Sequence, residues 1–247
     1  MLTEKIMAIL FYWDYTLGMV LGDIPTSQRI AILLERQGLR YSAQDVETAI
    51  QTRQDKIRAG ELQGSLSPQP RRDIIHFYRQ TLSILASREV DWAFASKLYT
   101  EFGYLPTVLY GDSLPTLQSL ARKGFSLGII SNNAASARRN IEMSVGSLID
   151  PTHIVISEEI GVHKPAKTIF DLGASRVGAH PQNCVYVGDN LEVDAIGAVR
   201  RGDYRYGLWI DRKGLGVDRD LPERVTCIIS LREVVGFVQY LNTKEDR

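Results

Sequence analysis

The chain has 247 residues, 44% hydrophobic and 23% charged, a composition typical of a folded globular protein built as one large domain or as a core with an insertion. Lysine plus arginine and aspartate plus glutamate each number 29, so the formal net charge is zero. This balance, without a dense basic run, argues against a nucleic-acid-binding surface.

A seven-residue apolar run that begins at Ile6 predicts a short buried strand, which ends in a loop carrying Asp14 and Thr16. In an open α/β sheet, chemistry is placed at such strand ends. The run is too short for a signal peptide or a membrane span, so we expect a cytoplasmic protein that has no membrane partner.

Residues 18–106 show a different pattern, in which only helices are predicted. Ser27 is expected to cap a helix that runs through Gln37, and Ser42 to cap a second helix. The glycines and prolines of Gly60–Pro70 predict a loop. Two further helices are predicted over Asp73–Ala86 and Trp92–Phe102. An all-helical insertion is therefore expected over residues 18–106.

After residue 107, apolar runs alternate with amphipathic helical stretches, which predicts a parallel sheet covered on both faces. The predicted strands are Ser126–Ser131, Ile154–Ile156, Cys184–Val187, Tyr206–Ile210 and Thr226–Ile229. The predicted helices are Leu114–Lys123, Ala135–Val145, Ala166–Val177, Leu191–Arg201 and Leu231–Leu241. With the opening strand, this predicts a doubly wound α/β sheet of about six strands formed by residues 1–17 and 107–247.

Polar residues cluster where several of these elements begin or end. Ser131 and Asn132 end one strand, Lys164 precedes a helix, and Asp189 follows another strand, with Asp194 five positions further on. Taken singly, a strand-end carboxylate is often a turn residue, a serine or aspartate a helix cap, and a lysine a solvated charge. Their order at successive strand ends favours one shared site.

In this order, the segments resemble the haloacid dehalogenase (HAD) superfamily of hydrolases, most of which are magnesium-dependent phosphatases. The first family motif, Asp-x-Asp-x-Thr, matches Tyr12, Asp14 and Thr16. The fourth, Gly-Asp-x-x-x-x-Asp, matches the segment from Gly188 to Asp194. The strand that ends at Ser131 fits the second family motif, and Lys164 fits the third. The resemblance therefore covers nearly the whole chain.

The resemblance implies a Rossmann-like core with an inserted helical cap over residues 18–106, which closes over the active site and selects small substrates. A plain helical subdomain without a gating role is the alternative. The implied catalytic residues are Tyr12, Asp14 as general acid and base, and Lys164. The implied phosphate-binding residues are Ser131, the amide of Asn132, and Thr16, which braces its loop. The implied Mg²⁺ ligands are the backbone carbonyl of Asp14 and the carboxylate of Asp189, with Asp194 as a further ligand or as a support for the ligands. Oxygen ligands in small number suit this ion.

Tyr12 stands where the family has its aspartate nucleophile. An aspartate would be charged at neutral pH, whereas a tyrosine offers one neutral phenol oxygen with a reference pKa of about 10 on a rigid ring. For Tyr12 itself to attack, a neighbour must lower its pKa, and Lys164 is the evident candidate.

Two functions stay open at this point. The chain is either a HAD-like hydrolase of the phosphomonoesterase type, impaired in turnover and acting on a small phosphorylated metabolite, or a pseudoenzyme. The pseudoenzyme would bind phosphate, or a phosphorylated ligand or partner, without hydrolysing it. The dehalogenase branch fits less well, because it too requires an aspartate nucleophile.

Overall fold

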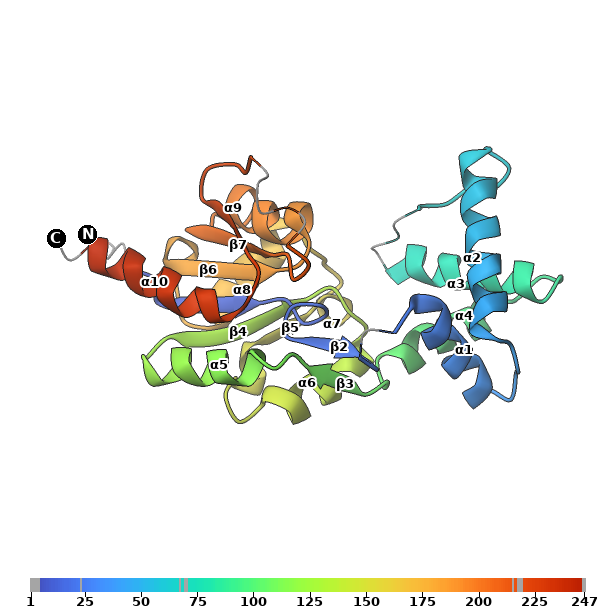
Figure 1. Cartoon of the computed structure of the whole chain (residues 1–247), viewed down its shortest axis with the longest axis horizontal. Helices are drawn as coiled ribbons and strands as arrows, with labels where there is room; N and C mark the ends of the chain where they lie inside the picture. Colours follow the sequence, from blue (N-terminus) through green and yellow to red (C-terminus); the bar gives the residue numbers. More distant parts are fainter. Residues whose placement is uncertain are drawn as a thin grey trace. The chain divides into compact units, whose positions relative to one another are not determined.

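The computed structural model describes residues 5–22, 24–66, 68, 71–214, 216 and 220–245. These residues form two compact units (Figure 1). The core unit comprises the described residues of 1–19, 107–132 and 141–247, and the helical unit those of 20–106 and 133–140. Residues 67, 69 and 70 of the predicted loop Gly60–Pro70 lie outside the described residues.

The core unit is built on a six-stranded parallel sheet in the order β5-β4-β1-β6-β7-β8. The strands are β1 (Ala8–Phe11), β4 (Ser126–Ser131), β5 (Ile154–Ile156), β6 (Cys184–Gly188), β7 (Tyr206–Ile210) and β8 (Val225–Ile228). All four residues of β1 are buried, as expected for a parallel strand covered on both faces. The predicted doubly wound α/β fold is confirmed.

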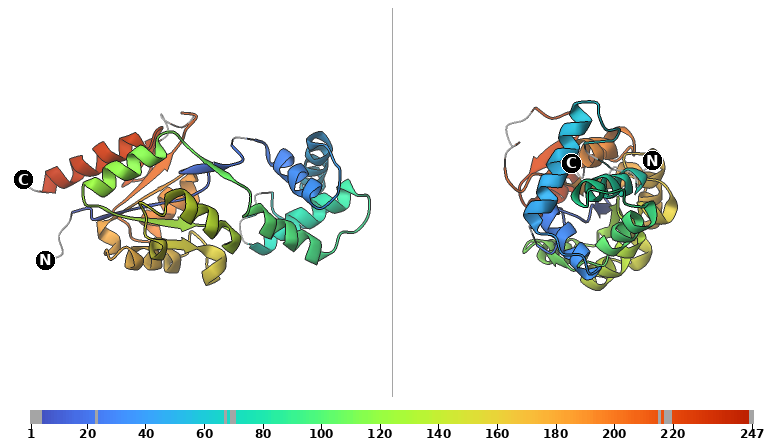
Figure 2. Two further views of the ribbon diagram at one scale, coloured as in Figure 1. Left: turned by 90° about the horizontal axis from the view of Figure 1, so that it is seen from below. Right: turned by 90° about the vertical axis from the view of Figure 1, so that its right-hand side faces the viewer.

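Helices cover both faces of this sheet. On one face α5 (Ser113–Arg122) and α10 (Arg232–Glu245) lie side by side (Figure 2, left). On the other, α8 (Lys167–Arg176) packs its Phe170 against Ala8 and Leu10 of β1. Because side chains alternate along a strand, Ile9 and Phe11 point to the opposite face. The remaining helices of this part of the chain are α6 (Arg138–Val145), α7 (Ser157–Ile160) and α9 (Gly197–Arg200), with the short turns η1 (Ala135–Ala137), η2 (Pro151–His153), η3 (Pro181–Asn183) and η4 (Leu191–Ile196).

The strand order places the ends of three strands in one row. Phe11 of β1 pairs with Ile129 of β4 on one side and with Val187 of β6 on the other. Tyr12 and Asp14, Ser131 and Asn132, and Asp189 follow this row by one to three positions on their strands, whereas Thr16 and Asp194 lie further along the chain. In doubly wound sheets, ligands bind at this carboxyl edge, where neighbouring connections lead to opposite faces.

The helical unit contains α1 (Thr26–Arg36), α2 (Ala43–Arg58), α3 (Arg71–Leu85) and α4 (Trp92–Phe102). Apolar side chains from all four helices form one buried cluster, including Leu33, Val46, Ile75 and Leu98. The expectation of helices alone over residues 18–106 is wrong at its start, where β2 (Gly18–Val20) pairs with β3 (Thr107–Leu109). A side chain at Gly18 would lie 2.5 Å from Thr107 Cγ2, so the close pairing requires glycine there. Among the described residues, no helix has the length and apolar character needed to cross a bilayer.

The two predicted serine caps have different outcomes. The Ser42 cap is confirmed: its hydroxyl accepts from the Asp45 amide at 3.1 Å, and the Asp45 carboxylate accepts from the Ser42 amide at 2.9 Å. The Ser27 cap is wrong, because α1 already begins at Thr26. The carbonyl of Pro25 accepts from the Arg29 amide, which places Ser27 inside the first turn.

Two predicted helices are divided in the structure. The helix expected over Ala135–Val145 starts as the 3₁₀ turn η1, and that expected over Leu191–Arg201 starts as the π-type turn η4. In η4 the carbonyl of Asn190 accepts from the amides of both Asp194 and Ala195, which widens the turn by one residue. Such one-turn irregularities depend on individual local hydrogen bonds that periodicity does not reveal.

We predict that Ser42→Ala lowers the free energy of unfolding by about 1 kcal/mol, because the Asp45 amide loses its acceptor. Ser27→Ala should change it by less than about 0.5 kcal/mol, although Ser27 is the more buried serine. Urea titrations followed by circular dichroism compare the two variants. Equal losses would contradict the capping role of Ser42.

Candidate active site

The loop after β1 carries the first candidate residues and is closed by backbone hydrogen bonds. The carbonyl of Trp13 accepts from the amides of Leu17 and Gly18 at 3.0 and 3.1 Å, and the amide of Tyr15 donates to the Gly18 carbonyl at 2.7 Å. The indole of Trp13 is buried and anchors the loop. Tyr15 adopts a left-handed φ of 55°, a conformation that costs a non-glycine residue about 1–3 kcal/mol and clusters at functional sites.

Lys164 is the central charge of the site. Its side chain is buried, and its ammonium donates to Asp194 Oδ1 at 2.5 Å and to the hydroxyl of Tyr186 at 2.8 Å. The same nitrogen lies 3.7 Å from the centre of the Tyr12 ring. Burial lowers the pKa of Lys164, and the neighbouring carboxylate of Asp194 opposes this shift. The lysine therefore joins residues that follow β1 with residues of and beyond β6.

Further hydrogen bonds orient both residues of this ion pair. The side chain of Asn132 accepts from the Lys164 amide at 2.8 Å and donates to the Lys164 carbonyl at 3.1 Å. Asp194 Oδ2 accepts from the Asn190 amide at 3.1 Å. A Cβ atom at position 188 would lie 2.4 Å from the same oxygen, so Gly188 makes room for Asp194. The side chain of Asn132 therefore orients the Lys164 segment. The predicted hydrogen bond to a phosphoryl oxygen would then come from the backbone amide of Asn132.

Asp189 has a buried carboxylate oxygen, Oδ1, that no donor among the described residues satisfies. Burial, then Asp194, raises the pKa of Asp189 to about 7, while Lys164 opposes the rise. The backbone carbonyl of Asp189 is fixed by the indole of Trp209 at 2.9 Å. A buried oxygen without a donor is suited to a cation.

The phenol of Tyr12 is surrounded by negative charge. Burial raises its pKa well above the ordinary value of 10.0, and the carboxylates of Asp14, Asp189 and Asp194 raise it further. Its hydroxyl makes a long contact of 3.5 Å with Asp14 Oδ2, while its ring covers the ammonium of Lys164. At neutral pH the phenol is therefore protonated.

Two hydroxyl groups of the site have no partner in the described part of the chain. Ser131 at the end of β4 and Thr16 in the loop after β1 are fully buried, and their hydroxyl oxygens make no hydrogen bond. Leaving such groups unsatisfied costs about 1–3 kcal/mol each. A ligand oxygen at Ser131 would satisfy its hydroxyl.

The structure thus brings together several of the residues that the sequence selected. The mutual contacts and electrostatic effects join Tyr12, Asp14, Lys164, Asp189 and Asp194. Within the described ranges, however, no group of three or more histidine, cysteine or acidic side chains is arranged to hold a metal ion. Both oxygens of Asp194 are already bonded, one to Lys164 and the other to the Asn190 amide.

Tyr186 is a site residue that sequence reasoning missed. Its hydroxyl accepts from Lys164 and donates to the Ile130 carbonyl at 2.6 Å. These two bonds connect β6 with Lys164 and with β4. The sequence pattern placed it only in an apolar strand. A tyrosine within a buried run was nevertheless a signal, because a buried phenol hydroxyl needs a partner.

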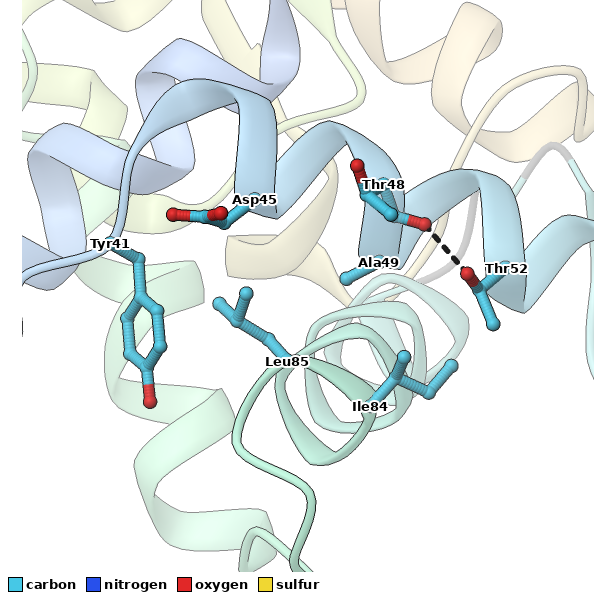
Figure 3. Close-up of a pocket in the computed structure, with 7 residues that line it drawn as sticks. All are labelled: Tyr41, Asp45, Thr48, Ala49, Thr52, Ile84 and Leu85. Carbon is cyan, nitrogen blue, oxygen red and sulfur yellow. Dashed lines mark hydrogen bonds between the residues drawn. The ribbon is translucent and has the colours of Figure 1, made fainter.

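A separate hollow of about 420 Å³ lies on the helical unit and is lined by Tyr41, Asp45, Thr48, Ala49, Thr52, Ile84 and Leu85 (Figure 3). The hydroxyls of Thr48 and Thr52 donate to carbonyls one turn earlier in α2. None of the residues that line this hollow belongs to the four sequence motifs. The candidate catalytic residues lie instead at the carboxyl edge of the sheet.

A family model of haloacid dehalogenase-like hydrolases matches residues 2–202. A glyceraldehyde 3-phosphate phosphatase of Methanopyrus kandleri is 42% identical over 103 residues, which cover 42% of this chain and 43% of that protein. A phosphoserine phosphatase of Thermus thermophilus is 29% identical over 104 residues, which cover 42% of this chain and 41% of that protein. The chain therefore spans less than half the length of these curated relatives.

Solved structures share the fold over nearly the whole chain. The magnesium-bound HAD-hydrolase YfnB of Bacillus subtilis aligns with a TM-score of 0.66 at 19% identity and covers 95% of this chain and 99% of its own. A 2-haloacid dehalogenase of Pseudomonas syringae aligns with a TM-score of 0.62 at 22% identity, over 96% of this chain and 99% of its own. At these identities the likeness concerns the fold.

We predict that Lys164→Met lowers the free energy of unfolding by about 3–5 kcal/mol, because it leaves the buried carboxylate of Asp194 without its partner. Lys167→Met is the matched control, since Lys167 pairs with Asp171 at 2.6 Å on an exposed helix face. The loss there should be about 0–1 kcal/mol. Guanidinium titrations measure both, and similar losses would contradict the central role of the buried pair.

Proposed function

The chain belongs to the haloacid dehalogenase-like hydrolase family, and from this premise we propose that it is a phosphomonoesterase-type hydrolase that acts on small phosphorylated metabolites with low turnover. The observation that carries the proposal is that the buried Lys164 ammonium interacts with Asp14 and Asp189 at the sheet edge where β4 ends in Ser131, whose hydroxyl has no partner among the described residues. Relatives that act on glyceraldehyde 3-phosphate, phosphoserine and N-acylneuraminate 9-phosphate support a small phosphorylated substrate.

The hydrolysis of a phosphate monoester is among the slowest uncatalysed reactions, so charge neutralisation and a proton source must act together. In the proposed roles, Asp14 gives a proton to the leaving oxygen as the bond from that oxygen to phosphorus breaks. A water oxygen forms the new bond to phosphorus, and a proton of that water passes to Asp14. The Ser131 hydroxyl and the Asn132 amide donate to phosphoryl oxygens. Lys164, held by Asp194, supplies positive charge to the same group.

The carboxylate of Asp189 and the backbone carbonyl of Asp14 are the groups proposed to hold Mg²⁺. The buried Asp189 oxygen without a donor fits a cation, and Mg²⁺ is commonly bound through one or two carboxylates plus waters and phosphate. When bound, the ion would neutralise phosphoryl charge. Asp194, which was expected to be a third ligand, is better suited to hold Lys164, because both of its oxygens are already bonded.

Tyr12 accounts for the low turnover in this proposal. Its phenol is held protonated by burial and by three carboxylates, so it replaces neither the attacking oxygen nor the metal ligand. The ammonium of Lys164 lies over the ring face and is paired with Asp194, which does not favour Tyr12 as a nucleophile. In a serine protease, removal of the nucleophile costs about a million-fold in turnover, and the remaining groups still give about 10³–10⁴-fold over water.

The same observation favours a second candidate function, a pseudoenzyme that binds phosphate or a phosphorylated ligand without hydrolysing it. The groups proposed to bind an anion are present, whereas Tyr12 replaces the carboxylate that would form the covalent intermediate. The helical unit would then serve as a binding cover or partner surface. In the hydrolase, it would act as the cap that selects the substrate.

We predict that Tyr12→Asp raises Mg²⁺-dependent phosphatase activity by at least about 10³-fold, because it supplies an ionised carboxylate at the end of β1. The assay uses p-nitrophenyl phosphate and a panel with phosphoserine, glyceraldehyde 3-phosphate and N-acylneuraminate 9-phosphate. Asp14→Asn added to this variant should abolish the gain.

Tyr12→Phe is the matched control, because it removes only the phenol oxygen. Equal low activity in the native chain and in Tyr12→Phe would support hydrolysis by the remaining groups. No activity in either, with phosphate bound by the native chain, would favour the pseudoenzyme. Activity that is high in the native chain and lost in Tyr12→Phe would instead make Tyr12 the nucleophile.

We further predict that Asp189→Asn weakens Mg²⁺ binding by at least about tenfold, because a neutral amide replaces the carboxylate. Isothermal titration of the chain with MgCl₂ provides the measurement. Asp203→Asn is the control, since Asp203 is exposed and asparagine tolerates its φ of 58°. An equal affinity in both variants would exclude Asp189 as a ligand.

A further inference from the structure

Arg212, in the turn after β7, connects separate parts of the core unit. Its guanidinium donates two hydrogen bonds of 3.1 Å to the two oxygens of Asp112. One of the same nitrogens donates to the backbone carbonyl of Thr16 at 2.6 Å. The guanidinium also stacks at 3.5 Å from the centre of the Tyr110 ring. Both terminal nitrogens and the face of this planar group are thus held, whereas its Nε atom has no hydrogen-bond partner among the described residues.

Asp112 fixes the arginine from its other side. It precedes α5, and its Oδ2 atom also accepts from the Ser230 hydroxyl and the Leu231 amide, both at 2.9 Å, before α10. Burial would raise the pKa of Asp112, but the hydrogen bonds from Arg212, Leu231 and Ser230 outweigh it and hold the pKa below the ordinary value. The carboxylate is therefore ionised and fully engaged at neutral pH.

The target of this arrangement is the loop that carries Asp14. The Thr16 carbonyl accepts from Arg212, and the next carbonyl, of Leu17, accepts from the Ser113 hydroxyl at 2.7 Å and the Tyr110 amide at 3.1 Å. Two successive carbonyls are thus fixed by groups from outside the loop. The left-handed Tyr15 lies between them and Asp14, so the strained conformation has an external support.

We propose that Arg212 is a positioning residue, which Asp112 and Tyr110 orient so that it fixes the Thr16 carbonyl and, through it, the loop that presents Asp14. The catalytic part of this inference rests on the proposed function. A partly exposed ion pair adds little stability by itself. The specific contribution of Arg212 is its planar fork, which satisfies a carboxylate and a carbonyl at once while stacking on a ring. Lysine cannot reproduce this geometry.

The first measurement is amide hydrogen exchange in the native chain at Tyr15, Leu17 and Gly18, whose amides close the loop. Arg212→Met keeps the aliphatic stem and removes the fork, and exchange at these amides should rise by about tenfold or more, the range for a hydrogen bond from a charged group. Arg212→Lys should restore only part of the protection. Arg176→Met is the matched control, because Arg176 is also half-buried in the core unit and donates to a backbone carbonyl, that of Ile154.

The second measurement uses Tyr12→Asp as the background. Adding Arg212→Met should lower kcat by about tenfold or more while KM changes less than about twofold, because a displaced Asp14 affects proton transfer more than binding. Adding Arg176→Met should change neither.

Uniformly faster exchange throughout the core unit, without a selective effect on the loop, would overturn the inference. Selective exchange with an unchanged kcat would overturn it as well, since the loop would then be ordered without consequence for Asp14. An inactive Tyr12→Asp chain would contradict the proposed function alone, because exchange in the native chain would still decide whether Arg212 fixes the loop.

Discussion

The buried ion pair between Lys164 and Asp194 is the interaction around which the candidate site is built. In a low-dielectric interior an unpaired ammonium is costly, so the chain surrounds this one with a carboxylate, a phenol hydroxyl and an aromatic face. Tyr12 follows β1, whereas Tyr186 lies in β6 and Asp194 in the turn beyond it. The contacts of this charge therefore connect the end of β1 with β6, and the Tyr186 hydroxyl extends the connection to the Ile130 carbonyl of β4.

Tyr12 changes what this arrangement can do without breaking it. The ring packs over Lys164 and so takes part in stabilising the buried charge, whereas its oxygen lies among carboxylates that keep it protonated. Tyr12 thus contributes to packing, although it lacks the carboxylate that the family uses as its nucleophile. In the proposed function, holding phosphate and cleaving it become separable properties of the chain.

Much of the fold followed from the sequence, because hydrophobic periodicity is a local property. The strands Ser126–Ser131, Ile154–Ile156 and Tyr206–Ile210 and the helix Trp92–Phe102 have the predicted bounds. The errors lie where a specific bond overrides the pattern. The Pro25 carbonyl starts α1 before Ser27, the Asn190 carbonyl opens the π-type turn η4, and the pairing of β2 with β3 lay outside the helical pattern of the insertion.

For the site, the sequence by itself determined which polar residues stand at strand ends, because residue type and spacing are written in it, and parallel strands bring those ends to one edge. Only the tertiary structure decided how these groups divide the work. It committed Asp194 to Lys164, turned the Asn132 side chain to the lysine backbone, and brought Arg212 onto the Thr16 carbonyl from 196 positions away. Such choices depend on which donors and acceptors meet once the chain is folded, and no local pattern encodes those meetings.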